Sequence, residues 1–288
     1  PELNDRLDVL ISYMTPVSDY STEITIDINR DRVLEDAFYI LKDISYWHDI
    51  TTDITVQFDD EEAADVGGLE REFLSLLAER LFLPRVLECN SGFGDQTYGY
   101  QLIPQDDQSD SESSDENLCD ETFSDCSENH FSVPLKSVVI YFGSPFECVD
   151  TDNKYYKISN SFSGPIEVYK FIGSFLGHLI LNKTPLKAKF VPSIAKLLLG
   201  HPLMFADLEF DDPVMFRSMS LFSESDFAAL PESSEFSDKQ SYLLAQALEF
   251  MYYRNEEKLE LMIQGFHSVL DPELLNTFFT PQEFVHLL

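Results

Sequence analysis

Basic residues are scarce in this 288-residue chain, which has 19 Lys and Arg against 52 Asp and Glu and a formal net charge of −33 at pH 7. A chain with this charge repels phosphate backbones and anionic lipid headgroups, so we expect it to bind neither nucleic acid nor a membrane surface. The charge favours a basic protein partner, although a solvated acidic surface is the commoner explanation of such an excess.

Cysteine and long hydrophobic runs are also scarce. The four Cys residues are unevenly spaced, which indicates reduced thiols and no disulfide framework. The longest apolar run, residues 171–181, is too short for a membrane span, which needs about 20 residues, and no signal-peptide pattern opens the chain. We therefore expect a cytoplasmic or nuclear protein. Because the chain begins with Pro1, we expect a fragment or a processed product.

Apolar residues are abundant, at 44% of the chain with 24 Phe and 13 Tyr, which predicts a folded protein of one or two domains. The pattern changes between Asp106 and Glu128, where acidic and Ser residues alternate without any Lys or Arg. Self-repulsion and the lack of apolar residues predict a disordered acidic insertion at about residues 104–132. Ser109 and Ser113, each followed three residues later by Glu, are candidate sites for acid-directed kinases.

The stretch from Val56 to Phe82 changes its period within one turn. Val56 and Phe58 alternate with polar residues as in a strand. An acidic run then leads to the Gly67-Gly68 pair, which favours a turn. Beyond the turn an apolar face repeats at helical spacing until Pro84, which ends the expected helix. The residues of that face are Leu69, Phe73, Leu76, Leu77 and Leu81.

This stretch resembles the opening of the N-lobe of HECT-type ubiquitin ligases, where a V-x-F strand precedes E-E-x-x-D-x-G-G-x-x-R-E-F and a long helix. The matching residues are Val56, Phe58, Glu61, Glu62, Asp65, Gly67, Gly68, Arg71, Glu72 and Phe73. The resemblance implies a structural corner that identifies the fold and carries no chemistry. The preceding segment resembles the family's x-R-x-x-x-L-x-D-A-F helix, with Arg30, Leu34, Asp36, Ala37 and Phe38 in those places.

A second segment, residues 166–202, predicts a helix that is apolar on all sides and therefore buried. Gly173 and Gly177 stand four residues apart on it, so another element can approach closely there. The segment resembles the family's Y-x-F-I-G-x-x-x-G-x-x-[IL] helix and the L-L-G-x-P ending of the next helix. Further matches follow in the family's order, a D-L-x-x-x-D-P segment from Asp207 and a G-F pair at Gly265.

The resemblance implies an α+β fold, predominantly helical, of the HECT N-lobe type with a large helical subdomain and a small, shortened one. Only about sixteen residues, 221–236, stand where the family usually has several further strands. The expected parts are an N-terminal lead-in at 1–21, a large subdomain at 22–200 that contains the acidic insertion, a reduced small subdomain at 201–246, and return helices at 247–288 that complete the large subdomain.

The resemblance also implies a function, the passage of ubiquitin from a conjugating enzyme to a ligase cysteine and then to a substrate lysine. This is covalent catalysis by a thiolate. In the family the cysteine lies in a separate C-lobe, in a motif ending T-C-F, and none of Cys89, Cys119, Cys126 and Cys148 lies in such a motif. We therefore expect no catalytic residue here and no transferase activity from this chain alone. The implied partners are a ubiquitin-conjugating enzyme, ubiquitin, and a protein substrate that the sequence does not identify.

Docking of the conjugating enzyme is the part of that function that this chain can carry. In the family an apolar groove of the small subdomain binds it. By position, the candidate residues here are Phe216, Met219, Leu221, Phe222, Tyr242, Leu243 and Phe250. Aromatic and Met residues at helical spacing are more often core residues, so both interpretations stay open. The alternative function is a degenerate, stand-alone interaction module that keeps the fold and transfers no ubiquitin.

No cofactor is expected. Cys119, Cys126 and His130 could supply three zinc ligands, but their spacing is not that of a known zinc site and they fall within the acidic insertion. The other histidines form no H-E-x-x-H motif or triad-like grouping, and no phosphate-binding G-x-x-x-x-G-K-[ST] motif occurs. His178, on the apolar helix, is expected to be a core histidine.

Overall fold

The computed structural model describes residues 2–14, 22–42, 52–59, 68–82, 144–150, 152, 154–186, 188–231 and 235–287. Within these ranges the chain is predominantly helical with two small sheets, which confirms the expected α+β class. The acidic insertion and its two candidate kinase sites lie outside the described residues.

The first half of the described elements contains both sheets. They are α1 (Leu3–Met14), β1 (Thr22–Ile28), η1 (Arg30–Arg32), α2 (Val33–Leu41), β2 (Thr52–Phe58), α3 (Gly68–Phe82), β3 (Phe146–Asp150), β4 (Tyr155–Ile158), α4 (Val168–Leu181), β5 (Lys189–Phe190) and α5 (Pro192–Leu198). β1 and β2 pair in parallel. In the second sheet β4 lies between β3, its antiparallel neighbour, and β5, its parallel neighbour.

The remaining described elements are helical. They are η3 (Phe205–Asp207), α6 (Leu208–Asp211), α7 (Pro213–Ser220), α8 (Glu224–Ala228), α9 (Lys239–Met251), η5 (Tyr253–Asn255), α10 (Glu256–Val269), α11 (Pro272–Phe278) and α12 (Pro281–Phe284).

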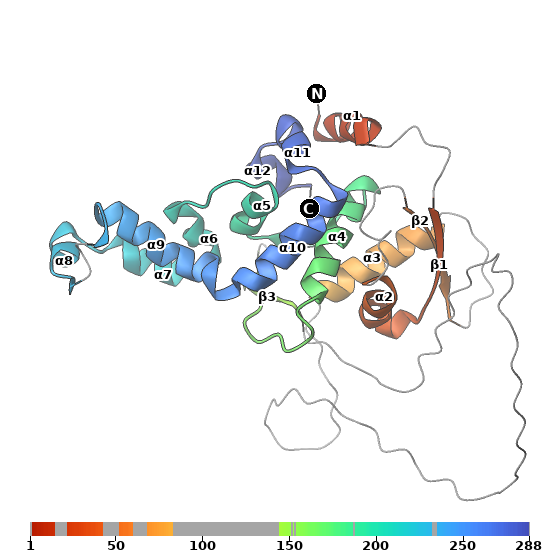
Figure 1. Ribbon diagram of the computed structural model, residues 1–288, viewed down its shortest axis with the longest axis horizontal. Helices are drawn as coiled ribbons and strands as arrows, with labels where there is room; N and C mark the ends of the chain where they lie inside the picture. The colour runs from red at the N-terminus through yellow and green to blue at the C-terminus, as the bar shows by residue number, and fades with distance from the viewer. Residues whose placement is uncertain are drawn as a thin grey trace, which may run out of the picture.

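These elements pack around two separate hydrophobic cores. The larger core takes residues from α1 to α5, from both sheets and from α10 to α12, and we call this part the body. The smaller core consists of Leu203, Leu208, Ala247 and Met251 with partly buried neighbours, and we call residues 201–251 the arm. In Figure 1 the arm extends to the left of the body, with α8 at its far end.

The strand and the helix of the expected corner, β2 and α3, are linked by residues of the sequence motifs, and the acidic run and turn expected between them, residues 60–67, lie outside the described residues. The Arg30 guanidinium lies over the Phe58 ring, 3.9 Å from its centroid, and pairs with Glu72 Oε1 at 2.7 Å. One cation therefore links η1, β2 and α3. At the start of α2, the Asp36 carboxylate accepts the Asn29 N–H at 3.1 Å, and burial raises the pKa of Asp36. These contacts are structural, as the interpretation of the motif as a corner requires.

Helix α4 is buried along most of its length and crosses α10 at very short range. A Cβ atom at Gly173 would overlap the Met262 carbonyl of α10, and a Cβ at Gly265 would overlap the Lys170 carbonyl of α4. The two backbones are therefore in direct contact, which only glycine permits. The close approach predicted at Gly173 and Gly177 is confirmed, and its partner is α10.

Two further expectations concern single segments. His178 is only 5% exposed within α4, as a core histidine should be. The strand β3 was not among the expected elements, because its sequence FECVD is short, contains two acidic residues and shows no long apolar alternation. It forms because its partner β4 supplies the pairing, with Phe146 buried opposite Ile158.

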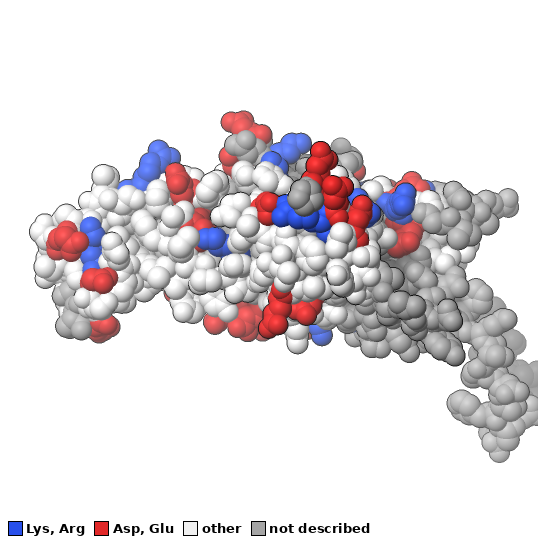
Figure 2. Space-filling model, turned by 90° about the horizontal axis from the view of Figure 1, so that it is seen from above, with Lys and Arg blue, Asp and Glu red and all other residues white. Residues whose placement is uncertain are grey.

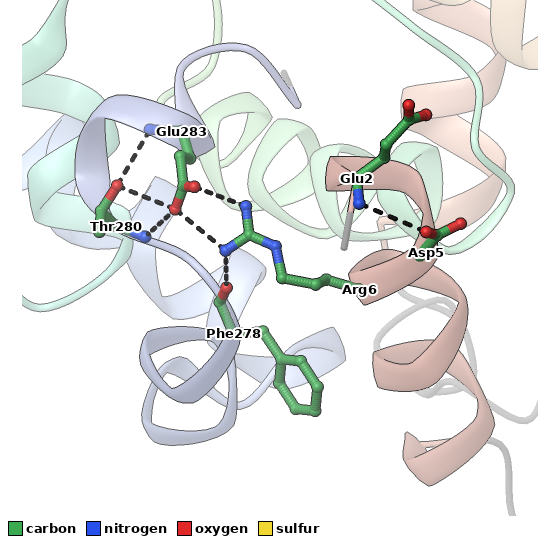
Figure 3. A network of polar contacts seen from close by, with 6 residues as sticks. All are labelled: Glu2, Asp5, Arg6, Phe278, Thr280 and Glu283. Carbon is green, nitrogen blue, oxygen red and sulfur yellow. Dashed lines mark hydrogen bonds and ion pairs between the residues drawn. The ribbon is translucent and has the colours of Figure 1, made fainter.

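Helix α1 attaches to the C-terminal helices through Arg6 (Figure 3). The Arg6 Nη1 donates to the Phe278 carbonyl at 2.8 Å, and Nη2 pairs with Glu283 Oε1 at 2.5 Å. The Glu283 carboxylate also accepts the N–H and the hydroxyl of Thr280, each at 3.0 Å, at the start of α12. The bond from Arg6 and those from Thr280 lower the pKa of Glu283 to about 2. One ion pair thus joins the two ends of the described chain.

Candidate docking site on the arm

The helices of the arm are short, and a side chain caps the first turn of each of the three that form its outer part. Asp212 caps α7, and Pro213 takes the first helical position. Ser223 and Asp226 form a capping box at α8, and Asp238 caps α9. Isolated helices of this length are marginal in water. The caps therefore define where each element of the arm begins.

Four of the seven candidate docking residues are buried or partly buried within the arm. Phe216 and Met219 on α7 and Phe250 on α9 are partly buried and pack against the smaller core. The Phe216 ring lies 5.1 Å from the Phe205 ring between centroids. Leu243 on α9 is 9% exposed. Packing contacts favour the core interpretation for Phe216, Met219 and Phe250, and burial favours it for Leu243.

Phe222 and Tyr242 come together next to α8. Their ring centroids are 5.7 Å apart and their planes are inclined by 29°. Phe227 and Phe236 add rings at 5.8 and 5.2 Å from Tyr242. We call these four residues the aromatic cluster, and each of them is partly exposed. Sequence analysis missed Phe227 and Phe236, although the capping box at Ser223 is a signal for the helix that places Phe227.

Leu221 is the most exposed large apolar residue in the described part of the chain, at 85%. Val214 on α7 is 74% exposed and lies seven residues earlier, about two helical turns away on the same side. The arm therefore exposes two large apolar side chains on this side, with Arg217 and Ser218 between them, and we call Val214 and Leu221 the apolar stripe. On the face shown in Figure 2, uncharged surface covers much of the arm, with acidic and basic side chains together at its far end, and charged residues also gather over the middle of the molecule.

Buried polar side chains lie where the arm meets the body. Lys196 Nζ on α5 contacts both carboxylate oxygens of Asp207 on η3, at 2.7 and 2.8 Å, and both side chains are 9% exposed. The same carboxylate accepts the Met204 N–H at 2.7 Å. Ser193 Oγ on α5 donates to Asp211 Oδ1 on α6 at 3.0 Å. We call Ser193, Lys196, Asp207 and Asp211 the polar seam.

Asp211 has the most unusual environment of the polar seam. Its residue exposure is 7%, and its Oδ2 has no hydrogen-bond partner among the residues that the structure describes. Burial raises the pKa of Asp211 to about 7, against the opposing effects of the Ser193 hydrogen bond and the Lys157 charge. The carboxylates of Asp207 and Asp212 add to the upward shift. Near neutral pH this carboxyl group is therefore close to half protonated.

Possible metal ligands and cysteine thiols are the other groups on which chemistry could depend in the described residues. They include no group of three or more His, Cys, Asp or Glu side chains arranged to hold a metal ion. Cys148 lies exposed on β3 opposite Tyr156 on β4. Cys89, Cys119, Cys126 and the zinc alternative that uses two of them fall outside the described ranges. Across the described helices, none has both the length and the apolar character to span a membrane.

Comparison with known proteins connects this arrangement to one family. The HECT-domain (ubiquitin-transferase) family model matches residues 117–230. The E3 ubiquitin-protein ligase pub3 of Schizosaccharomyces pombe is 21% identical over 281 residues, which cover 89% of this chain and 29% of that protein. The E3 ubiquitin-protein ligase RSP5 of Chaetomium thermophilum is 21% identical over 284 residues, 90% of this chain and 28% of that protein.

A shorter match has a higher sequence identity. The E3 ubiquitin-protein ligase hecw-1 of Caenorhabditis elegans is 40% identical over 58 residues, 20% of this chain and 5% of that protein. The chain spans less than a third of the length of pub3 and RSP5. The motif order, the helical fold and these matches agree, and the chain is a relative of the HECT-type ubiquitin ligases, as its motifs indicate.

Proposed function

We propose that this chain is the non-catalytic N-lobe of a HECT-type ubiquitin-protein ligase. In this proposal the arm docks a ubiquitin-conjugating enzyme, and ubiquitin passes to a cysteine on a C-lobe and then to a substrate lysine. The relatives pub3, RSP5 and hecw-1 are named as E3 ubiquitin-protein ligases, which supports the ligase assignment. The same proposal divides the chain into a large subdomain at 22–200, completed by 247–288, with a reduced small subdomain at 201–246 between them.

The single observation that carries the docking role is the apolar stripe on an arm that has its own core. Val214 and Leu221 stay exposed although apolar surface gains free energy when it leaves water. Leu221 is followed directly by Phe222 of the aromatic cluster, and apolar residues that gather at the surface of a folded protein are typical of interaction sites. The partly exposed rings of the aromatic cluster, Phe222 and Tyr242 among them, are the residue type that anchors protein interfaces.

The candidate residues then divide into two roles. Leu221 contacts the conjugating enzyme directly, and Phe222 and Tyr242 supply the aromatic anchor beside it. Phe216, Met219, Leu243 and Phe250 hold α7 and α9 in place from inside. The net charge of −33 adds long-range attraction for a basic docking face, which raises the association rate more than the affinity.

One observation favours the alternative function, a degenerate HECT-like interaction module without transferase activity. Within residues 201–231 and 235–251 the arm contains helices and no strand, whereas the family usually has several strands there. A shortened arm offers a smaller surface to a conjugating enzyme. In this alternative the arm binds a different protein partner through the same apolar stripe.

Titration of the chain with a panel of conjugating enzymes, by calorimetry, separates the two. If the arm docks the enzyme, Leu221→Asp should lower the affinity by about tenfold or more, because it places a charge in a desolvated contact. Phe222→Ala and Tyr242→Ala should weaken binding as well. The matched control is Val9→Asp, which introduces the same charge at an apolar residue of α1, 45% exposed, in the body.

Two outcomes contradict the proposal. Binding that Leu221→Asp leaves unchanged would place the docking site elsewhere on the molecule. Absence of binding to every conjugating enzyme in the panel would favour the interaction module.

A further inference from the structure

The polar seam lies where the arm is attached to the body. Helix α6 has four residues and packs against α5 of the body and against α7 and α9 of the arm. The buried residues of the two cores are separate, with Leu208 in the smaller and Ile194 in the larger, and the partly buried Leu197 and Tyr252 pack against both. Beside these apolar contacts, α6 is joined to α5 by a buried polar contact between Ser193 and Asp211.

Asp211 is surrounded by a defined set of polar and charged groups. From the body, Ser193 donates to its Oδ1, and Lys157 Nζ donates to its backbone carbonyl at 3.3 Å. The nearby carboxylates, Asp207 and Asp212, are held respectively by Lys196 and by the first turn of α7. Helix α9 directs Ala247 and Met251 toward the arm core, and Glu249 on the same helix is exposed.

The neutral and the ionised form of the carboxyl group fit this environment differently. One oxygen accepts a hydrogen bond from Ser193, and Oδ2 has no partner among the described residues. A buried carboxylate with one unsatisfied oxygen is costly, and the cost falls when the group is neutral or reaches water. Separation of α6 from α5 would expose this carboxyl group to water.

We propose that Asp211 is a proton-dependent latch between the body and the arm. The protonated carboxyl keeps α6 seated against α5, and loss of the proton weakens that seat, so that the arm opens more readily near neutral pH than at mildly acidic pH. The significance of this opening for docking a conjugating enzyme rests on the proposed function. The latch itself does not, because it is a property of the chain alone.

The direction follows from proton linkage. The pKa of Asp211 is about 7 with the arm seated and returns toward its ordinary value of 3.8 when the carboxyl reaches water. The seated state therefore binds the proton more tightly. Between these two values each unit of rising pH favours opening by up to about tenfold, and above about pH 8 the opening equilibrium becomes constant.

Hydrogen–deuterium exchange of the whole chain between pH 5.5 and 8.5, corrected for intrinsic exchange rates, tests the latch. In the native chain, peptides covering residues 205–220 should open several-fold more often at about pH 6.5 than at about pH 5.5 and level off above about pH 8. Asp211→Asn keeps the shape and cannot ionise, so its exchange should not depend on pH. Glu209→Gln, which removes an exposed carboxylate from the same helix, should behave as the native chain does.

A second variant protects the test against misfolding of Asp211→Asn. Ser193→Ala removes the hydrogen bond that favours the ionised carboxylate, so the levelling-off should move to higher pH. If Ser193 had a purely structural role, Ser193→Ala would change the extent of hydrogen exchange and would not move the pH at which exchange levels off. A native chain without pH dependence, or an Asp211→Asn variant that retains it, would overturn the proposal. No conjugating enzyme enters the assay, so its outcome is independent of the docking test.

Discussion

The body and the arm are held together by different means. In the body, α4 and α10 touch backbone to backbone at Gly173 and Gly265, and a large apolar core surrounds that contact. The arm has four buried apolar residues in its own core, and it relies in addition on capped helix starts and on the polar seam. The shape of the body is therefore fixed by close packing, whereas the arm is attached by a small apolar contact at Leu197 and Tyr252 together with polar contacts that can be broken singly.

The strongest test of this contrast is Gly173→Ala in the body. The added Cβ would overlap the Met262 carbonyl, which is backbone and cannot move aside. We expect a loss of about 4 to 5 kcal/mol in the free energy of unfolding, measured by urea denaturation. The matched control is Gly200→Ala, where no atom lies within 4 Å of the added Cβ and only the positive φ of 71° resists the change. It should cost about 1 kcal/mol. Equal losses at the two positions would contradict the close-packing account.

The next largest effect is expected for Lys196→Met, which breaks the polar seam. It leaves the Asp207 carboxylate buried without its cation, which typically costs about 3 kcal/mol or more. Hydrogen exchange should rise in the arm, residues 203–220, while α4 and α10 stay protected. The double variant Lys196→Met with Asp207→Leu should recover part of the loss, because no charge is left buried. If hydrogen exchange in α4 rose as much as hydrogen exchange in the arm, the two regions would not be separable.

The smallest effect concerns the attachment of α1 to the body. The pKa of Glu283 is about 2 against an ordinary value of 4.5, so its ion pair with Arg6 contributes above pH 4.5 and is lost as the pH falls toward 2. Limited proteolysis within α1 should be slow at pH 7, and Arg6→Gln should accelerate it there. Lys183→Gln is the matched control, because it removes a cation that contacts α1 at the exposed Asp8. If both variants accelerated proteolysis within α1 equally, Arg6 would have no special role in holding α1 to the body.

Much of the body could be predicted from sequence because its signals are local. The alternation at Val56 and Phe58, the all-round apolar helix from Val168 and the small residues at Gly173 and Gly177 each follow from the period of one element. The order of the motifs then identified the family. What the sequence could not show was the element that meets those glycines, α10, because it lies about ninety residues further along the chain.

The arm was harder to predict, for two physical reasons. Phe216 and Leu221 look alike in a helical pattern, yet the first packs against the arm core and the second is 85% exposed. Burial depends on the neighbours, which a period does not reveal. The Ser193–Asp211 contact is likewise invisible, because nothing in residues 18 positions apart marks them as a pair. The seven candidate docking residues therefore remain a prediction.

The crossing of α4 with α10 also bears on how the chain folds while it is being synthesised. Ser174 Oγ on α4 donates to the Gly265 carbonyl across a sequence separation of 91 residues, and all of the arm lies between the two helices. Contacts this distant close slowly, because the loop between them must be ordered first. The arm is one continuous segment that leaves the ribosome before α10 does. We infer that the arm can assemble first and that α4 keeps its apolar surface uncovered until the last third of the chain has emerged.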